Sequence, residues 1–371
     1  MIRVFEPKIT FSDINSVVKT LLKNNISGTS PTVANFELSL ANKFEREYVV
    51  AVSNGSTALD LAFESLNLKK GDEVIVPSFT IISCLAAIIR AGATPIFCDV
   101  DSSSWNMKLE NITTVFTENT KAVLMVHLYG LAGEATKIEK FCKEKNIFLI
   151  EDSAEAHGQF VDGRPCGSFG NISTMSFYAN KHITTGEGGA VLTNDLEISN
   201  KIKSMRNLGF IDSKRFFHDK LYWNYRLGGM QAALGISQVK HLEKTIKLKI
   251  KQGKIYQELL SNKIEFLDTQ LEIWNGIENQ YWVFGVKLKI SNIRDLVMSD
   301  LLNKGIETRP FFWPLHLQPV LSKEFKNSIK NLSVSEKLGN DGLYIPIGSH
   351  LNIKKQKFIV KNLIASIKHY V

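Results

Sequence analysis

The chain has 371 residues, of which 44% are hydrophobic and 22% charged, as in globular proteins large enough to bury a substantial core. Its net charge of +8 would suit a nucleic-acid binder or an anionic small substrate, but the lysines are spread along the chain. The densest group, in residues 244–254, fits the solvated face of a helix. No apolar run approaches the roughly 20 residues of a membrane span. We therefore expect neither a nucleic-acid nor a membrane partner.

The N-terminal residues lack an apolar signal core followed by a cleavage site, which predicts a cytoplasmic protein. The four cysteines, Cys84, Cys98, Cys142 and Cys166, are scattered without a C-x-x-C pair, so we expect neither a disulfide framework nor a zinc or other metal site. Cys84 and Cys98 lie in apolar segments and are expected in the core.

From about residue 49 to 195, short β-rich runs alternate with helical patterns. The expected strands cover residues 49–54, 73–78, 94–100, 121–130, 147–152, 172–179 and 190–194. Helices are expected at 57–66, 80–91 and 134–146. Apolar strands that alternate with helices predict an α/β fold with a mostly parallel sheet covered on both faces.

A long helical pattern starts near Met230, runs past Tyr256 and is expected to link two domains. Beyond it, strands are expected at 281–289, 306–312 and 343–348, and a last helix at 354–368. We expect a large domain over residues 1–240 and a smaller α+β domain over 241–371.

Three strand ends carry candidate chemistry, because ligands of parallel α/β sheets bind at the carboxyl ends of the strands. The first is SNGSTAL, residues 53–59, where Gly55 permits a tight turn and a helix begins at Ser56 and Thr57. Free N–H groups at such a helix start would hold a phosphate. The alternative is a plain turn with Ser56 as the N-cap.

The second strand end is IFLIEDSAEAHG, residues 147–158, where four apolar residues lead into Glu151, Asp152 and then Glu155. A buried carboxylate is costly unless it is paired. It either faces a cationic ligand atom or accepts hydrogen bonds from loop amides.

The third is SFYANKHITTGEGG, residues 176–189, which sets Lys181 between a strand and a glycine-rich turn. A partly desolvated lysine has a lowered pKa and becomes a nucleophile towards carbonyls. The alternative is an ordinary loop lysine. Taken together, a phosphate cradle, a buried acid and a lysine match the phosphate, ring nitrogen and aldehyde of pyridoxal phosphate.

These motifs resemble the DegT/DnrJ/EryC1/StrS sugar aminotransferases, pyridoxal-phosphate enzymes of the aspartate-aminotransferase fold (type I), over nearly the whole chain. The landmarks are VSNGSTALDLAFESL, GDEVIVPSFT, AGATPIFCDVD, EDSAEAHG, GSFGNISTMSFYANKHITTGEGGAVLTND, WNYRLGGMQAALGISQ and GIETRPFFWPLH. Within the family, residues 176–189 are most similar to the GDP-perosamine synthase group.

The resemblance implies roles residue by residue. Lys181 matches the lysine that bonds covalently to the cofactor aldehyde, and Asp152 matches the acid at the ring nitrogen. Ser56, Thr57 and Ser176 match phosphate contacts.

Glu155 matches a residue near the ring hydroxyl that is glutamine in many relatives. Asn224 matches an asparagine that reaches the phosphate of the other subunit, which implies a homodimer with shared active sites. Ile81 stands where many relatives carry an aromatic residue on the ring. His182 follows the lysine, whereas related sugar dehydratases replace the lysine itself by histidine, so Lys181 favours transamination.

The resemblance also implies the reaction. Glutamate is the expected amino donor, and the acceptor a nucleotide-linked 4-keto-6-deoxyhexose used for surface polysaccharide biosynthesis. His182, Arg226, Arg309 and His316 are candidate substrate contacts, although either arginine would also suit a structural ion pair. Acceptor contacts are expected in the loops over residues 210–225 and 311–318.

Several alternatives stay open. One alternative is that the acceptor is a small phosphorylated ketone such as dihydroxyacetone phosphate. Another is that the protein is a sugar dehydratase or a non-catalytic relative. A nicotinamide-dependent dehydrogenase also fits the α/β pattern, but the first strand–helix turn has no G-x-G-x-x-G.

Overall fold

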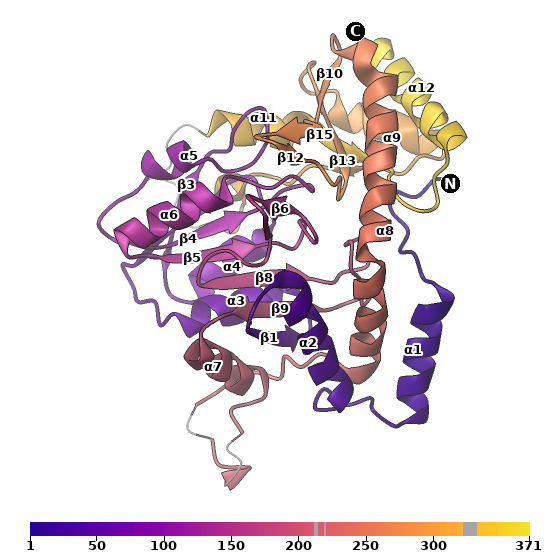
Figure 1. The fold of residues 1–371 in the computed structure, drawn as a ribbon. Helices are drawn as coiled ribbons and strands as arrows, with labels where there is room; N and C mark the ends of the chain where they lie inside the picture. Colours follow the sequence, from indigo (N-terminus) through magenta and orange to yellow (C-terminus); the bar gives the residue numbers. More distant parts are fainter. Residues whose placement is uncertain (211–213, 219, 322–331) are drawn as a thin grey trace.

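The computed structural model describes residues 1–210, 214–218, 220–321 and 332–371 (Figure 1). Its main sheet has seven strands in the order β1-β9-β8-β5-β4-β2-β3, and only β9 runs antiparallel to its neighbours. The strands are β1 (Tyr48–Val52), β2 (Glu73–Pro77), β3 (Thr94–Cys98), β4 (Thr120–Val126), β5 (Phe148–Asp152), β8 (Ile172–Ser176) and β9 (Gly189–Thr193). The predicted mostly parallel α/β sheet is confirmed.

Helices cover both faces of this sheet, because its buried strands alternate side chains between two cores. Val50 and Val52 of β1 belong to a core with α3 (Gly55–Ser65), α4 (Ile82–Arg90) and α7 (Leu196–Arg206). Val49 and Ala51 point the other way, to a core with α2 (Pro31–Phe44) and α8 (Gly229–Leu260). Farther along that face, α5 (Leu109–Thr113) and α6 (Ala135–Lys145) cover β4 and β5.

The long helix α8 connects this sheet with the C-terminal part of the chain (Figure 1). A second, antiparallel sheet there has the order β10-β13-β15-β14. Its elements are β10 (Leu267–Thr269), β13 (Phe284–Leu288), β14 (Arg309–Pro310) and β15 (Gly342–Ile345), with α9 (Arg294–Asn303), α11 (Ser333–Asp341) and α12 (Ile353–His369). The predicted domain boundary after residue 240 falls inside α8 and stays a prediction.

Several elements were not predicted from the sequence. The N-terminal helix α1 (Phe11–Leu22) packs along α8. Two hairpins are formed by β6 (Phe160–Val161) with β7 (Arg164–Pro165) and by β11 (Ile273–Trp274) with β12 (Ile277–Glu278). Short 3-10 helices cover Ser261–Lys263 and Leu315–Leu317.

Two details bear on the sequence predictions. Cys84 and Cys98 are buried as expected. The lysine group in residues 244–254 does lie on a helix, but Lys249 within it is only 7% exposed, so the prediction of a wholly solvated face is wrong at this position. Within the described ranges, no helix has both the length and the hydropathy needed to cross a bilayer.

Candidate active site

A cavity of about 650 Å³ opens at the carboxyl ends of three strands of the main sheet, β1, β5 and β8. Asn54 follows β1, Asp152 ends β5 and Ser176 ends β8, and all three line the cavity. Aromatic side chains from the C-terminal part, Trp282 and Tyr344 among them, line it as well. The cavity therefore lies between the two sheets, at the strand ends that the sequence singled out.

The start of α3 forms the first part of the site. Asn54, not Ser56, is the N-cap: its side chain accepts a hydrogen bond from the Thr57 N–H at 2.9 Å, and the Thr57 hydroxyl donates back to the Asn54 carbonyl. The Ser56 hydroxyl instead contacts the Ser83 hydroxyl at 2.7 Å and faces the cavity. The free N–H groups of this helix end and the Ser56 hydroxyl suit a phosphate.

Gly55 and Ser176 make this cradle tight. A Cβ at Gly55 would lie 2.7 Å from the Cβ of Ser176, so only glycine fits here. The sequence placed both residues at the phosphate end, and the structure brings together Ser56, Thr57 and Ser176 around one cavity.

Asp152 provides a buried acid at the end of β5. Its Oδ1 accepts a hydrogen bond from the Ala154 N–H at 3.0 Å, and the Cys84 Sγ lies 3.7 Å from Oδ2. Burial raises the pKa of Asp152, while the Ala154 N–H and the charge of Lys181 oppose that rise. A cationic group placed against this carboxylate would offset the cost of its burial.

Lys181 lies in the same cavity, with its side chain 9% exposed. Its Nζ is 3.5 Å from the Glu155 Oε1 and 3.8 Å from the centre of the Trp282 ring. Burial lowers the pKa of Lys181, although Glu155 and Asp152 oppose this shift. Burial raises the pKa of Glu155 to about 7, against the charge of Lys181 and the Tyr129 N–H that donates to it. Lys181 is thus a desolvated lysine with a lowered pKa, which is the environment in which a lysine amine can act as a nucleophile.

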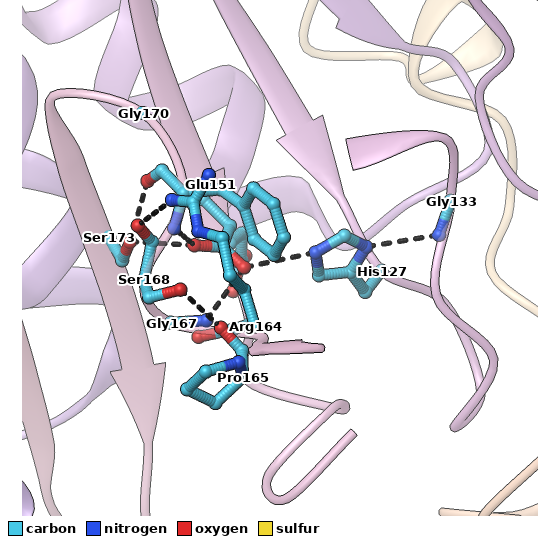
Figure 2. A network of polar contacts seen from close by, with 12 residues as sticks. His127, Gly133, Glu151, Arg164, Pro165, Gly167, Ser168, Gly170 and Ser173 are labelled. Atoms are coloured by element: carbon cyan, nitrogen blue, oxygen red, sulfur yellow. Dashed lines mark hydrogen bonds and ion pairs between the residues drawn. The ribbon is translucent and has the colours of Figure 1, made fainter. Parts of the chain in front are cut away.

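Glu151, next to Asp152, points away from the cavity into a network of polar contacts (Figure 2). The Glu151 side chain is fully buried. It accepts hydrogen bonds from loop amides, which is one of the two roles expected for an acid at this strand end. Its four donors are the His127 Nε2 at 3.0 Å, the Gly167 N–H at 2.7 Å, the Phe169 N–H at 2.9 Å and the Ser173 hydroxyl at 2.7 Å. These contacts fix the end of β5, from which Asp152 projects.

The His127 imidazole has a defined tautomer in this network. Its Nδ1 accepts the Gly133 N–H at 3.1 Å, so the proton is on Nε2, which donates to Glu151. Cys166 also offers a ligand atom within 4.8 Å of those of His127 and Glu151. Because both imidazole nitrogens and both carboxylate oxygens already make hydrogen bonds, we interpret this group as structural.

These residues fit pyridoxal phosphate. The cradle at Gly55 and Ser176 has no room for a Cβ. Among the described residues, the buried Asp152 carboxylate makes no ion pair within 4.0 Å, and the desolvated Lys181 of the same cavity acts on it through its charge. Ile81, which is 41% exposed, lines the cavity and contributes an apolar side chain to its wall. The cavity volume of about 650 Å³ leaves room for a substrate beside the cofactor.

The other predicted site residues lie outside this cavity. Asn224 is exposed and pairs with Asn207 through a β-bridge. The Arg226 guanidinium donates to the Asn207 side chain, and Arg309 is exposed and ion-paired with Glu307 at 2.6 Å. As substrate contacts, both arginines remain predictions.

The two candidate histidines are buried. His316 bonds through Nδ1 to the Ser78 hydroxyl at 2.6 Å and through Nε2 to Glu336 at 3.1 Å. His182 lines a second cavity behind Lys181. In the loops proposed for the acceptor, residues 211–213 and 219 lie outside the described residues.

Sequence reasoning missed Arg90, Trp282 and Tyr344, which line the cavity. Tyr225 and Phe312 also line it, and they belong to the two loops expected to contact the acceptor. The Arg90 guanidinium donates hydrogen bonds to both carboxylate oxygens of Asp60, at 3.0 and 3.1 Å. The charges of both residues act on the Tyr225 hydroxyl. Trp282 precedes β13 in a run recognised only as a strand. No local pattern distinguishes these aromatic residues from ordinary core residues, because their role depends on contacts across the chain.

Comparisons with known proteins agree with this geometry. The model of the DegT/DnrJ/EryC1/StrS aminotransferase family matches residues 8–364. GDP-perosamine synthase of Escherichia coli O157:H7 is 33% identical over 98% of this chain and 97% of its own length, and that of Vibrio cholerae is 36% identical over 86% and 87%.

Among solved structures, a GDP-4-keto-6-deoxymannose-3-dehydratase with bound GDP-perosamine matches with a TM-score of 0.89 and 25% identity, over 98% of this chain and 100% of that one. The family match extends over both sheets and includes every residue of the cofactor cavity. This chain therefore belongs to the DegT/DnrJ/EryC1/StrS aminotransferase family.

Proposed function

We propose that this protein, a pyridoxal-phosphate-dependent sugar aminotransferase, moves the amino group of glutamate to a GDP-linked 4-keto-6-deoxyhexose. The observation that carries the proposal is the placement of Lys181, Asp152 and the Gly55–Ser176 cradle around one cavity. The two GDP-perosamine synthases similar to this chain support the choice of acceptor. A 4-amino sugar made in this way would serve surface polysaccharide biosynthesis.

The residues divide the work by position. When bound, pyridoxal phosphate accepts the electron pair left behind when a proton leaves the donor Cα. Lys181 has a lowered pKa, so its neutral amine is available to take that proton. Asp152, as a carboxylate, would hold a proton on the ring nitrogen of the bound cofactor. Glu155 forms an ion pair with Lys181 when the lysine carries the proton.

Lys181 also separates amino transfer from dehydration. Related dehydratases place histidine where this chain has Lys181, and a histidine cannot form the covalent link to the cofactor aldehyde. The neighbouring His182 does not substitute for Lys181, because it faces the second cavity.

We further propose a homodimer with shared active sites. Asn224 is exposed and does not line the cavity of its own chain, as expected for a residue that serves the partner's site. The cytoplasmic location likewise stays a prediction from the sequence. Arg226, Arg309, His182 and His316 remain candidate substrate contacts.

One experiment tests the acceptor. The purified enzyme is converted to its amino form with glutamate, the excess donor is removed, and candidate ketones are added singly while the visible absorption band of the cofactor is followed. The GDP-linked 4-keto-6-deoxyhexose should restore the band within a few turnovers. If dihydroxyacetone phosphate or a free keto sugar restores it and the GDP-linked sugar does not, the aminotransferase stands and the proposed acceptor is wrong.

A further inference from the structure

Lys249 is a buried cation without a counter-charge. It projects from α8 and is 7% exposed, and its ammonium donates one hydrogen bond, to the Trp282 carbonyl at 2.7 Å. Among the described residues, no carboxylate lies within 4.0 Å of it. Burial, and then the nearby charge of Lys181, lower the pKa of Lys249 to about 7. Such a charge is costly unless something neutralises it.

Lys249 is one of the residues that line a cavity of about 150 Å³. This cavity lies behind the active site, since Asn180 and Lys181 line both cavities. Lys8, Lys244 and Lys249 line it as well, and among the described lining residues Glu6 is the only one with a carboxylate. The cavity is therefore electropositive, which favours a negatively charged occupant.

Unpaired polar atoms also line this cavity. His182 is 2% exposed, and within the described part of the chain neither of its ring nitrogens makes a hydrogen bond of good geometry, although the His157 backbone lies close enough to raise the pKa of the ring. Burial, and then the charge of Lys249, keep the pKa of His182 well below its usual range. The ring is therefore neutral and has one N–H to donate.

We propose that this cavity binds a small inorganic anion of the chloride and bromide class, held by the Lys249 ammonium and the His182 ring N–H. The anion supplies the missing counter-charge and accepts donors that are otherwise unpaired. This inference concerns a site separate from the cofactor cavity and does not depend on the proposed acceptor.

Anion binding is linked to the proton on Lys249. The anion stabilises the charged ammonium, so binding should be tighter below pH 7 and weaker as Lys249 deprotonates above it. Other titratable groups face this region from the N-terminal segment, the Lys181 loop, α8 and the turn before α12. They are Glu6, Lys8, Lys181, His182, Lys244 and His350, and His157 in the loop after β5 also acts on the His182 ring.

The test uses the cofactor-free full-length protein, so that it does not depend on catalysis. Melting temperatures are measured at pH 6 in sodium chloride and in sodium isethionate, a larger organic anion, at equal ionic strength. Chloride should raise the melting temperature by roughly 1–3 °C over isethionate. The gain should vanish in Lys249→Met and shrink at pH 8.5. Lys247→Met removes an exposed charge two residues away on α8 and should keep the gain.

Crystals of the wild-type protein grown in sodium bromide give a second measurement that does not depend on folding of a variant. An anomalous bromide peak in contact with the Lys249 Nζ is expected. A cavity without bromide would overturn the proposal. A chloride gain of equal size in wild type and Lys249→Met would also overturn it, because the binding would then be at the surface.

Discussion

Lys181 is the residue through which the proposed chemistry passes, because it is desolvated, in reach of Glu155 and on the cavity wall. We expect Lys181→Ala to lower the rate of the glutamate half-reaction by at least about 10³-fold, since general acid–base catalysis and the covalent link are both lost. Stopped-flow absorbance measures this rate. Lys247→Ala, on the exposed side of α8, should leave it unchanged, and near-normal turnover by Lys181→Ala would exclude the assignment.

Asp152 tests the role of charge at the ring nitrogen. Asp152→Asn keeps the shape of the side chain but removes the negative charge, so turnover should fall by about 10²–10³-fold with little change in melting temperature. Asp295→Asn on exposed α9 is the control. A wild-type rate in Asp152→Asn would show that another group holds the ring proton.

Glu155 makes the stability of the cofactor-free protein depend on pH. Its pKa is about 7 in the folded protein and about 4.5 in the unfolded chain, so the folded state binds the proton more tightly. The stability that this group contributes is therefore present below pH 4.5 and is lost as the pH rises to about 7. Glu155→Gln should flatten this part of the profile in urea unfolding series. An unchanged slope would place the titration elsewhere.

At the scale of the elements, the Glu151 network joins the carboxyl ends of β4 and β5 to the start of β8 (Figure 2). Burial raises the pKa of Glu151, but the His127, Gly167 and Ser173 donors outweigh it and lower the pKa. In Glu151→Gln, the amide would present its own N–H groups to these donors and leave at least one unpaired. We expect a loss of about 1–3 kcal/mol of unfolding free energy.

The control for this network is Glu144→Gln, the same substitution at an exposed position of α6. It should change the stability by less than about 0.5 kcal/mol. If the two variants unfold at the same urea concentration, the network does not hold β5 in place.

At the scale of the whole molecule, the shared site of the proposed homodimer can be tested by complementation. Lys181→Ala and Asn224→Ala subunits, each impaired alone, should regain part of the activity when mixed under conditions of subunit exchange, because a mixed dimer can contain one intact site. Sedimentation velocity checks the oligomeric state. A fully active monomer at assay concentration would rule out the shared site.

The sequence by itself determined that strands and helices alternate along the part of the chain that forms the main, mostly parallel sheet, and it singled out three strand ends as candidates for chemistry. Lys181, Asp152 and Ser56 each follow an apolar strand, and parallel strands bring their carboxyl ends to one edge, so local patterns were sufficient to place them together. The family resemblance added their roles.

Only the tertiary structure decided which residues close the site and which charges are buried. Trp282, Phe312 and Tyr344 reach the cavity because α8 carries the second sheet back against the first, a contact that no local pattern encodes. Lys249 looks like any other lysine of a solvated helix until the Lys181 loop and the N-terminal segment pack over it. Periodicity fixes which face of an element is apolar, whereas burial of a single polar side chain depends on what packs on that face.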